Sequence, residues 1–258
     1  MRCVGRIALV TGGDSGIGAA TAEALAREGA DVALTYLHDA EGATRTIRAV
    51  ESAGRRALAV RSDAADPDAV AALFARVEAE LGPPDALVNN AGLGQGGTPL
   101  AEMTDEGWDA VIRTDLTAPF YMTRAFVRLR RRHGGGGRIV NVTSVHESVP
   151  CPGAIAYGAA KGGLRMITRT LALEVAPERI TVNSVAPGLT DTPMTAGQIH
   201  GDPSEREKEL AAIPLGRPAW PDEIGRLVVY LVSRDADYVT GQSFVVDGGL
   251  SINVGQGA

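Results

Sequence analysis

A tyrosine and a lysine stand four positions apart in an alanine-rich stretch, Tyr157-Gly-Ala-Ala-Lys161, which we expect to be helical. This spacing places both side chains on one helix face, one turn apart. A free phenol titrates at about 10, and a cation within about 4–6 Å favours its ionised form. Such a tyrosine can donate or accept a proton during catalysis. The same pair could also arise by chance on a helix surface.

A serine hydroxyl is a candidate partner for this tyrosine. Ser144 directly follows the apolar run 138–143, which is typical of a buried strand, and could hold a substrate oxygen against Tyr157. His146 and Glu147 come next and could face the pocket, where a polar pair suits a hydroxyl-rich substrate such as a sugar. The alternative is that both side chains lie on a loop surface.

Apolar runs alternate with amphipathic segments along the whole chain, and this alternation predicts the fold class. Strands are expected at 6–11, 31–36, 56–60, 85–88, 138–143, 180–185 and 243–246. Helices are expected at 19–28, 40–53, 67–81, 104–132, 154–175, 204–212 and 221–232. The sequence therefore predicts a single α/β domain over residues 1–258, with one doubly wound parallel sheet flanked by helices.

A glycine-rich turn follows the first strand, with the spacing Gly12-x-x-x-Gly16-x-Gly18. This differs from the common Gly-x-Gly-x-x-Gly fingerprint of dinucleotide-binding proteins. The mechanics are similar, since glycines permit a tight turn and the next helix points its first amides at an anion. The turn is thus a candidate site for a pyrophosphate, although an ordinary strand–helix turn can also be rich in glycine.

Composition excludes several functional classes. The net charge is −6 and the isoelectric point about 5.3, so nothing favours nucleic acid or anionic membranes as partners. Two cysteines, Cys3 and Cys151, fit no metal or redox spacing, and we predict no metal site. The first residues lack the apolar core of a signal peptide, and no apolar run approaches the roughly 18 residues of a membrane span. We therefore expect a soluble cytoplasmic protein with free thiols.

Five motifs together resemble the short-chain dehydrogenase/reductase family, and the resemblance covers nearly the whole chain. They are Thr11-Gly-Gly-Asp-Ser-Gly-Ile-Gly18, Asn89-Asn-Ala-Gly92, Ser144 with Tyr157 and Lys161, Pro187-Gly188 with Thr192, and Asp247-Gly-Gly249. The segment 144–147 and the tail 254–258 are also similar to the glucose 1-dehydrogenase branch. The resemblance implies a Rossmann-like fold and hydride transfer between a nicotinamide and an alcohol or carbonyl carbon.

The resemblance also implies roles for individual residues. Tyr157 would be the general acid in reduction and the base in oxidation. Lys161 would favour ionisation of the tyrosine and bind the nicotinamide ribose. Ser144 would hydrogen-bond the substrate oxygen. Together with His146, which is predicted from its position after the serine and not from the resemblance, Ser144 and Tyr157 are the predicted substrate contacts. Asp63 would meet the adenine amino group.

The predicted cofactor-binding residues come from five segments of the chain. They are Gly12, Asp14, Ser15, Gly16, Ile17, Gly18, Asp63, Ala64, Asn90, Ala91, Gly92, Tyr157, Lys161, Pro187, Gly188 and Thr192. For Asn90 the alternative is a turn residue that merely ends its strand.

One candidate catalytic residue departs from the family pattern. The family usually has asparagine where Asp115 stands; there the asparagine kinks the helix, and a main-chain carbonyl holds a water that leads to the lysine. The carbonyl survives the substitution, but the amide donor does not. A buried Asp115 must be protonated or paired to serve in the same place, and we expect it to alter the pH dependence of the reaction.

The choice between NAD and NADP depends on the end of the second strand. NAD-specific members usually carry an acidic residue there, and NADP users a basic one, whereas here Tyr36 is followed by Leu37 and His38. Asp14 should repel a 2′-phosphate, although Ser15 and His38 could still donate to one. The sequence slightly favours NAD.

Other expectations concern the substrate and assembly. The segment 189–213 is predicted to be a mobile lid. The leading function is an NAD(P)-dependent alcohol or sugar dehydrogenase. The alternatives are a 3-oxoacyl thioester reductase of the same family and a catalytically weak, dinucleotide-binding regulator. The resemblance further implies a homotetramer formed through the helices at 104–132 and 154–175 and the last strand.

Overall fold

The computed structural model describes residues 1–94 and 97–253, and within them seven strands form one parallel sheet. Their order across the sheet is β3-β2-β1-β4-β5-β6-β7. The strands are β1 (Ile7–Val10), β2 (Asp31–Tyr36), β3 (Ala57–Arg61), β4 (Ala86–Asn89), β5 (Gly137–Val142), β6 (Ile180–Pro187) and β7 (Ser243–Val246). The chain winds outward in both directions from β1 and β4, which confirms the predicted doubly wound sheet.

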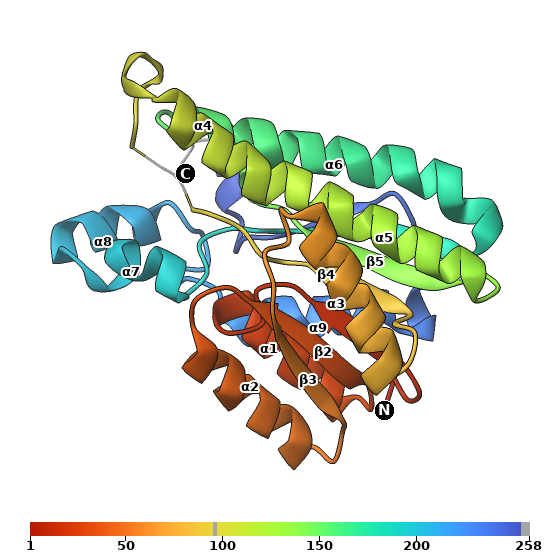
Figure 1. The fold of residues 1–258 in the computed structure, drawn as a ribbon. Coiled ribbons are helices and arrows are strands. Elements are labelled where there is room, and N and C mark those ends of the chain that lie inside the picture. Colours follow the sequence, from red (N-terminus) through yellow and green to blue (C-terminus); the bar gives the residue numbers. More distant parts are fainter. Residues whose placement is uncertain (95–96, 254–258) are drawn as a thin grey trace.

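Helices cover both faces of this sheet (Figure 1). One face carries α1 (Gly16–Arg27), α2 (Ala40–Ser52) and α9 (Pro221–Val232), and the other carries α3 (Pro67–Glu80), α5 (Ala118–Arg132) and α6 (Ile155–Val175). Two short helices, α7 (Ala196–His200) and α8 (Pro203–Ala211), lie together beyond one end of the sheet (Figure 1). Among the described residues, the helices are all too short or too polar to span a bilayer.

The helix predicted over 104–132 is interrupted around Asp115, the position at which the family's asparagine kinks the helix. It consists of α4 (Asp105–Ile112), the π-helical turn η2 (Arg113–Thr117) and α5. A π-helical turn carries one extra residue, so it changes the direction in which side chains leave the helix. Asp115 sits in this turn with its carboxylate buried inside the protein.

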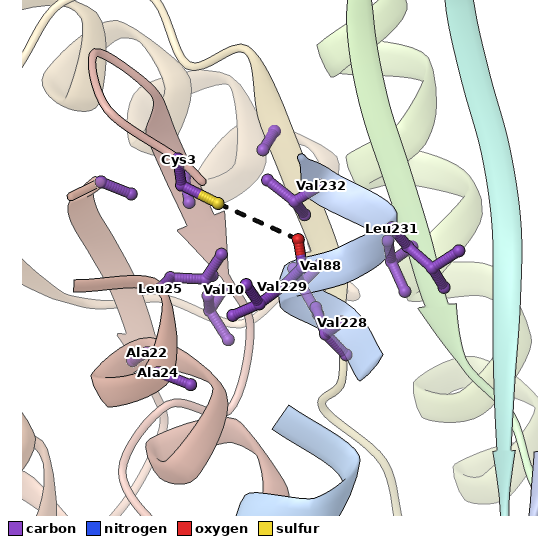
Figure 2. Close-up of a cluster of buried hydrophobic side chains, with 14 of the residues drawn as sticks. Cys3, Val10, Ala22, Ala24, Leu25, Val88, Val228, Val229, Leu231 and Val232 are labelled. Carbon is purple, nitrogen blue, oxygen red and sulfur yellow. Dashed lines mark hydrogen bonds between the residues drawn. The ribbon is translucent and has the colours of Figure 1, made fainter. Parts of the chain in front are cut away.

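Small apolar side chains fill the layer between α1, α9 and the sheet. Figure 2 shows side chains of α1, such as Leu25, close to those of α9, such as Val228 and Val229. The N-terminal segment closes this layer, where the Cys3 thiol lies 3.9 Å from the Val229 carbonyl oxygen. Burial raises the pKa of the Cys3 thiol to about 11, so this cysteine stays protonated and packs as an apolar side chain.

Parallel pairing brings the carboxyl ends of the central strands to one edge of the sheet. Val10 of β1 pairs with Val88 of β4, and Asn89 pairs with Asn141 of β5. The strands β1 and β4 are the point from which the chain winds in opposite directions, and such points leave a crevice outside the carboxyl ends of the strands. The predicted site residues follow these strand ends.

Candidate active site

The glycine turn between β1 and α1 forms a backbone cradle at this crevice. Gly12 and Gly16 adopt positive φ angles of 62° and 51°, which residues other than glycine rarely adopt. A Cβ atom at Gly12 would lie 3.1 Å from the Ala91 Cα atom, so the glycine turn and the turn after β4 approach each other closely. Helix α1 starts at Gly16 with no cap from any described side chain and no acidic residue in its first turn. Its first amides are therefore available to an anion such as a diphosphate.

Gly18 differs from the other glycines of the turn, because it does not line the crevice. It is buried, and a Cβ atom there would lie 1.9 Å from the Gly12 carbonyl oxygen and 2.5 Å from the Asn90 side-chain nitrogen. Its part is to let α1 pack against the turn. The structure thus places Gly18 beneath the predicted cofactor contacts and not among them.

A cavity of about 590 Å³ extends from the glycine turn along the carboxyl ends of the strands to Tyr157. Its lining contains the other predicted cofactor residues: Gly12, Asp14, Ser15, Gly16, Ile17, Asp63, Ala64, Asn90, Ala91, Gly92, Tyr157, Lys161, Pro187, Gly188 and Thr192. The segment after β6 closes it, since a Cβ atom at Gly16 would lie 3.2 Å from the Thr192 Cβ atom. An elongated cavity that begins at an anion cradle fits a dinucleotide.

Tyr157, Lys161 and Ser144 meet at the far end of this cavity, and all three line it. The Lys161 ammonium lies 5.3 Å from the centre of the Tyr157 ring. Ser144 follows β5 and begins the short 3₁₀ turn η3 (Val145–Glu147), and its hydroxyl accepts a hydrogen bond from the His146 amide at 3.2 Å. The hydroxyl hydrogen of Ser144 can therefore point to another acceptor.

The Lys161 ammonium is held by two oxygen atoms below the tyrosine. It donates to the Val142 carbonyl at 3.3 Å and lies 3.2 Å from the Asp115 carboxylate, while only 4% of the residue is exposed. Burial alone would lower the pKa of Lys161, but the charges of Asp115 and Tyr157 outweigh it and raise this pKa above its ordinary value. The ammonium therefore stays charged at neutral pH.

Of the two alternatives for a buried Asp115, protonation or pairing, the structure shows a paired carboxylate. Its second carboxylate oxygen accepts a hydrogen bond from the Leu93 amide at 2.6 Å, and the residue is completely buried. Burial raises the pKa of Asp115, whereas Lys161 and the Leu93 amide oppose the shift. A Cβ atom at Gly92 would contact both charged groups at 3.3–3.4 Å, so only glycine fits beside this pair without a shift.

The two polar residues after Ser144 lie apart from the cavity. The His146 ring centre lies 6.2 Å from that of Tyr157, and its Nδ1 atom is 3.0 Å from the Val149 carbonyl oxygen, but it does not line the cavity. Its predicted contact with substrate stays a prediction. The Glu147 carboxylate turns away and accepts a hydrogen bond from Ser243 of β7 at 2.5 Å. The Glu147 side chain therefore neither lines the cavity nor lies on the loop surface.

A buried chain of polar side chains, missed from the sequence, supports the site from below. The Asn89 side-chain amide donates to Thr123 of α5 at 3.0 Å and to Asn141 of β5 at 2.8 Å. Asn141 in turn donates to Thr168 of α6 at 2.8 Å. These bonds tie two central strands to α5, which directly follows the π-helical turn with Asp115, and to α6, which carries Tyr157. The signal was present, because asparagine is unusual in a buried strand.

A second missed residue joins the glycine turn to the turn after β4. The Thr11 hydroxyl accepts hydrogen bonds from the amides of Asn90 and Ala91, both at 2.9 Å. The Asn90 side chain returns a bond to the Thr11 carbonyl at 2.9 Å. Asn90 therefore combines the two interpretations left open earlier, since it both secures its turn and lines the cavity.

Comparisons with known proteins agree with this geometry. Residues 12–251 match a family model described as enoyl-(acyl carrier protein) reductase. The chain is 43% identical over 247 residues to cis-4-hydroxycyclohexanecarboxylate dehydrogenase of Sinomonas cyclohexanicum, covering 95% of this chain and 96% of that protein. It is 34% identical over 249 residues to glucose 1-dehydrogenase 2 of Bacillus subtilis, covering 96% and 95%.

Among solved structures, one from Agrobacterium tumefaciens is described as a candidate 2-deoxy-D-gluconate 3-dehydrogenase with bound NADP. It is similar to this chain with a TM-score of 0.88 and 34% identity, and 98% of each chain is covered.

Proposed function

Since the chain belongs to the short-chain dehydrogenase/reductase family and is an NAD(P)-dependent oxidoreductase, we propose that Tyr157, Lys161 and Ser144 carry out its hydride-transfer reaction on a secondary alcohol or carbonyl. The observation that carries this proposal is that these three residues line one end of a cavity whose other end is the glycine turn. The matching family model and the relatives confirm the family resemblance that the five motifs indicated.

The nicotinamide, when bound, supplies or accepts the hydride. In the oxidation direction, the Tyr157 phenolate takes the proton from the substrate hydroxyl, and in reduction the phenol returns it. Ser144 donates its hydroxyl hydrogen to the substrate oxygen and stabilises the negative charge that develops there. Lys161 holds a positive charge beneath the Tyr157 ring, and from this position its ammonium can also reach ribose hydroxyls.

We propose NAD as the preferred cofactor because two carboxylates lie near the ends of the glycine turn and β2. Asp14 lines the cavity, and burial and the nearby charge of Asp39 raise the pKa of Asp14. Asp39 also lines the cavity and accepts a hydrogen bond from the Gly42 amide at 2.7 Å. Two acidic groups disfavour the doubly charged 2′-phosphate of NADP. Among the described residues, Arg45 lies 3.4 Å from the Asp39 carboxylate and offsets part of its charge, and His38 also lines the cavity.

The substrate that we propose is a secondary alcohol on a sugar or a small ring. The relatives named above act on a ring-bearing hydroxy acid and on glucose according to their names. The lining of the cavity also contains apolar Leu93 and Met194 together with the hydroxyl-bearing Thr190 and Thr195. Such a wall suits a ring with apolar faces and a few hydroxyl groups.

The test is a cofactor-reduction screen of sugars, polyols and cyclic secondary alcohols, run with NAD and NADP in parallel. We expect turnover with at least one sugar or cyclic alcohol and a higher kcat/KM with NAD. Cofactor binding without reduction by any alcohol, and without oxidation by any carbonyl, would support the regulator alternative instead.

A second candidate function is reduction of a 3-oxoacyl thioester. The description of the matching family model names an acyl carrier protein, which favours an acyl thioester as substrate, although the enoyl reduction that it names acts on a carbon–carbon double bond and not on a 3-oxo group. A kcat/KM for a 3-oxoacyl thioester that exceeds those for all sugars and cyclic ketones would decide for it.

We further propose a cytoplasmic homotetramer, with the segment 189–213 acting as a lid. Support for assembly comes from apolar side chains exposed on α5 and α6, among them Phe120, Met166 and Leu173, the last with 81% of its surface accessible. Support for a reducing compartment comes from the free thiols of Cys3 and Cys151. Light scattering after size-exclusion chromatography should give four times the mass of the 26.7 kDa chain.

A further inference from the structure

The buried pair of Asp115 and Lys161 implies a property of the reaction beyond the roles proposed above. Lys161 lies 3.2 Å from the Asp115 carboxylate and 5.3 Å from the centre of the Tyr157 ring. An ammonium alone, at this distance from the half-buried Tyr157 ring, would favour the phenolate. A carboxylate in contact with the ammonium cancels much of its field, because the pair is nearly neutral when seen from the phenol.

We propose that Asp115 is a positioning residue that neutralises Lys161, so that proton abstraction by Tyr157 requires a higher pH than an uncompensated ammonium would require. The inference rests on the proposed function of Tyr157 as the proton acceptor. It concerns the pH at which alcohol oxidation proceeds and not the identity of the alcohol.

Of the described charged and titratable groups around Lys161 and Tyr157, Asp115 is the one placed to neutralise the Lys161 ammonium. Among the described residues, Asp115 approaches Lys161 from η2, and His146 of η3 approaches the Tyr157 ring. Glu147 of η3 is directed to Ser243 and Arg165 instead. The remaining acidic residues that line the cavity, Asp14, Asp39 and Asp63, follow β1, β2 and β3 and therefore lie toward the other end.

Asp115 has a second contact, and the choice of variants must separate the two. Its other oxygen accepts a hydrogen bond from the Leu93 amide and so holds the chain just after Gly92. Asp115→Asn removes the negative charge but keeps an oxygen for Leu93, whereas Asp115→Ala removes both. An effect of charge appears in both variants, while an effect of loop position appears only in the alanine variant.

The first measurement is the pH dependence of kcat/KM for alcohol oxidation. In Asp115→Asn the acidic limb of the profile should move to lower pH by about one unit, which is the lower end of the usual effect of a nearby charge. At pH values on that limb, kcat/KM should then rise by up to about tenfold. Asp109→Asn is the matched control, because Asp109 is an exposed acid in α4 and should leave the profile unchanged. An unchanged profile in Asp115→Asn would overturn the proposal.

The second measurement needs no substrate and therefore separates this inference from the proposed function. The sequence contains two lysines, Lys161 and Lys208, so selective ¹³C labelling gives two side-chain signals, with Lys208 of α8 as the reference. Without Asp115 the Lys161 signal should titrate at lower pH. The phenolate absorbance lost in Tyr157→Phe should also appear at lower pH when Asp115 is replaced by asparagine. If the phenolate signal does not move, the proposal is wrong even where hydride transfer is observed.

Discussion

Carboxylates at the two edges of the sheet have different surroundings, and burial shifts the pKa of one of them upward while partners lower the pKa of the other. At the amino ends of the strands, carboxylates are satisfied by several donors: Arg6 meets Asp85 at 2.9 Å, and Arg56 meets Asp31 at 2.7 Å. At the carboxyl ends, Asp115 and Lys161 form a more deeply buried pair. A glycine is required beside them, and the phenol of Tyr157 lies above them.

The difference separates stability from chemistry within one sheet. Burial alone would raise the pKa of Asp31, but hydrogen bonds from the Arg56 side chain and amide, together with the charge of Arg55, hold it below its ordinary value. The pKa of Asp115 is raised instead, because burial outweighs its single ammonium partner and one amide. The ionised form of Asp31 at the amino-terminal edge is therefore stabilised by its partners. The ionised form of Asp115 at the carboxyl-terminal edge is destabilised by its burial.

Replacing the tyrosine should have the largest effect and would test the carboxyl-terminal edge directly. In Tyr157→Phe the proton acceptor is lost, so kcat for alcohol oxidation should fall by about a thousandfold, within the usual range for general acid–base catalysis. Tyr238→Phe is the control, since Tyr238 is fully exposed and should retain activity. Equal kcat values for Tyr157→Phe and the parent protein would contradict the assigned role.

Removing the serine hydroxyl should have the next largest effect. Ser144→Ala loses a donor to the developing oxyanion, so kcat should fall by about a hundredfold with little change in melting temperature. Ser144→Thr retains a hydroxyl and should recover part of the rate. A loss confined to KM would mean that Ser144 only binds the substrate.

The amino-terminal edge should respond in stability and not in rate. Asp31→Asn removes the charge that Arg55 and Arg56 bind, so the free energy of unfolding should fall by about 1–3 kcal/mol. The folded-state pKa of Asp31 lies below its unfolded value of about 3.9, so the ionised group stabilises the fold above that pH. This contribution is lost as pH falls through the folded-state pKa. Urea unfolding at pH 7 and at pH 3 measures both effects.

In the same experiment, the difference between parent and variant should be largest at neutral pH and should shrink in acid. The pH profile of kcat/KM should stay unchanged at temperatures below melting. A shifted profile in Asp31→Asn would show that the two edges are electrostatically coupled, and Asp31 could then not be assigned to stability alone.

The smallest expected effect concerns the cofactor end of the cavity. Asp14→Asn removes one of the charges that oppose a 2′-phosphate, so the ratio of kcat/KM for NADP to that for NAD should rise by about tenfold. Both values are measured with one alcohol at saturating concentration. A ratio that stays constant would mean that Asp14 does not face the adenosine ribose.

Much of this architecture could be predicted from the sequence because its signals are local. Apolar runs set the strands, and β2, α9 and β7 begin and end where they were expected. The five-residue helix α7 was missed, since so short a segment has no clear periodicity. The resemblance pointed to a kink at Asp115, but its π-helical form was not predicted, because the apolar spacing of 104–132 fits a continuous helix.

The candidate site shows the same limit. Spacing and motif order predicted that Tyr157, Lys161 and Ser144 share one cavity. They could not show that Glu147 turns to β7, since that depends on Ser243, almost a hundred positions along the chain. Nor could the pattern of glycines distinguish Gly18, which packs a helix, from Gly12, which lines the cavity.

The most direct test of the central claim is to follow the hydride itself. An alcohol identified in the screen is prepared with deuterium on its carbinol carbon, and the reduced cofactor is analysed by mass spectrometry. We predict one deuterium in the reduced nicotinamide made by the parent protein and almost no reduced cofactor from Tyr157→Phe. Reduced cofactor without deuterium, or an equal yield from Tyr157→Phe, would contradict it.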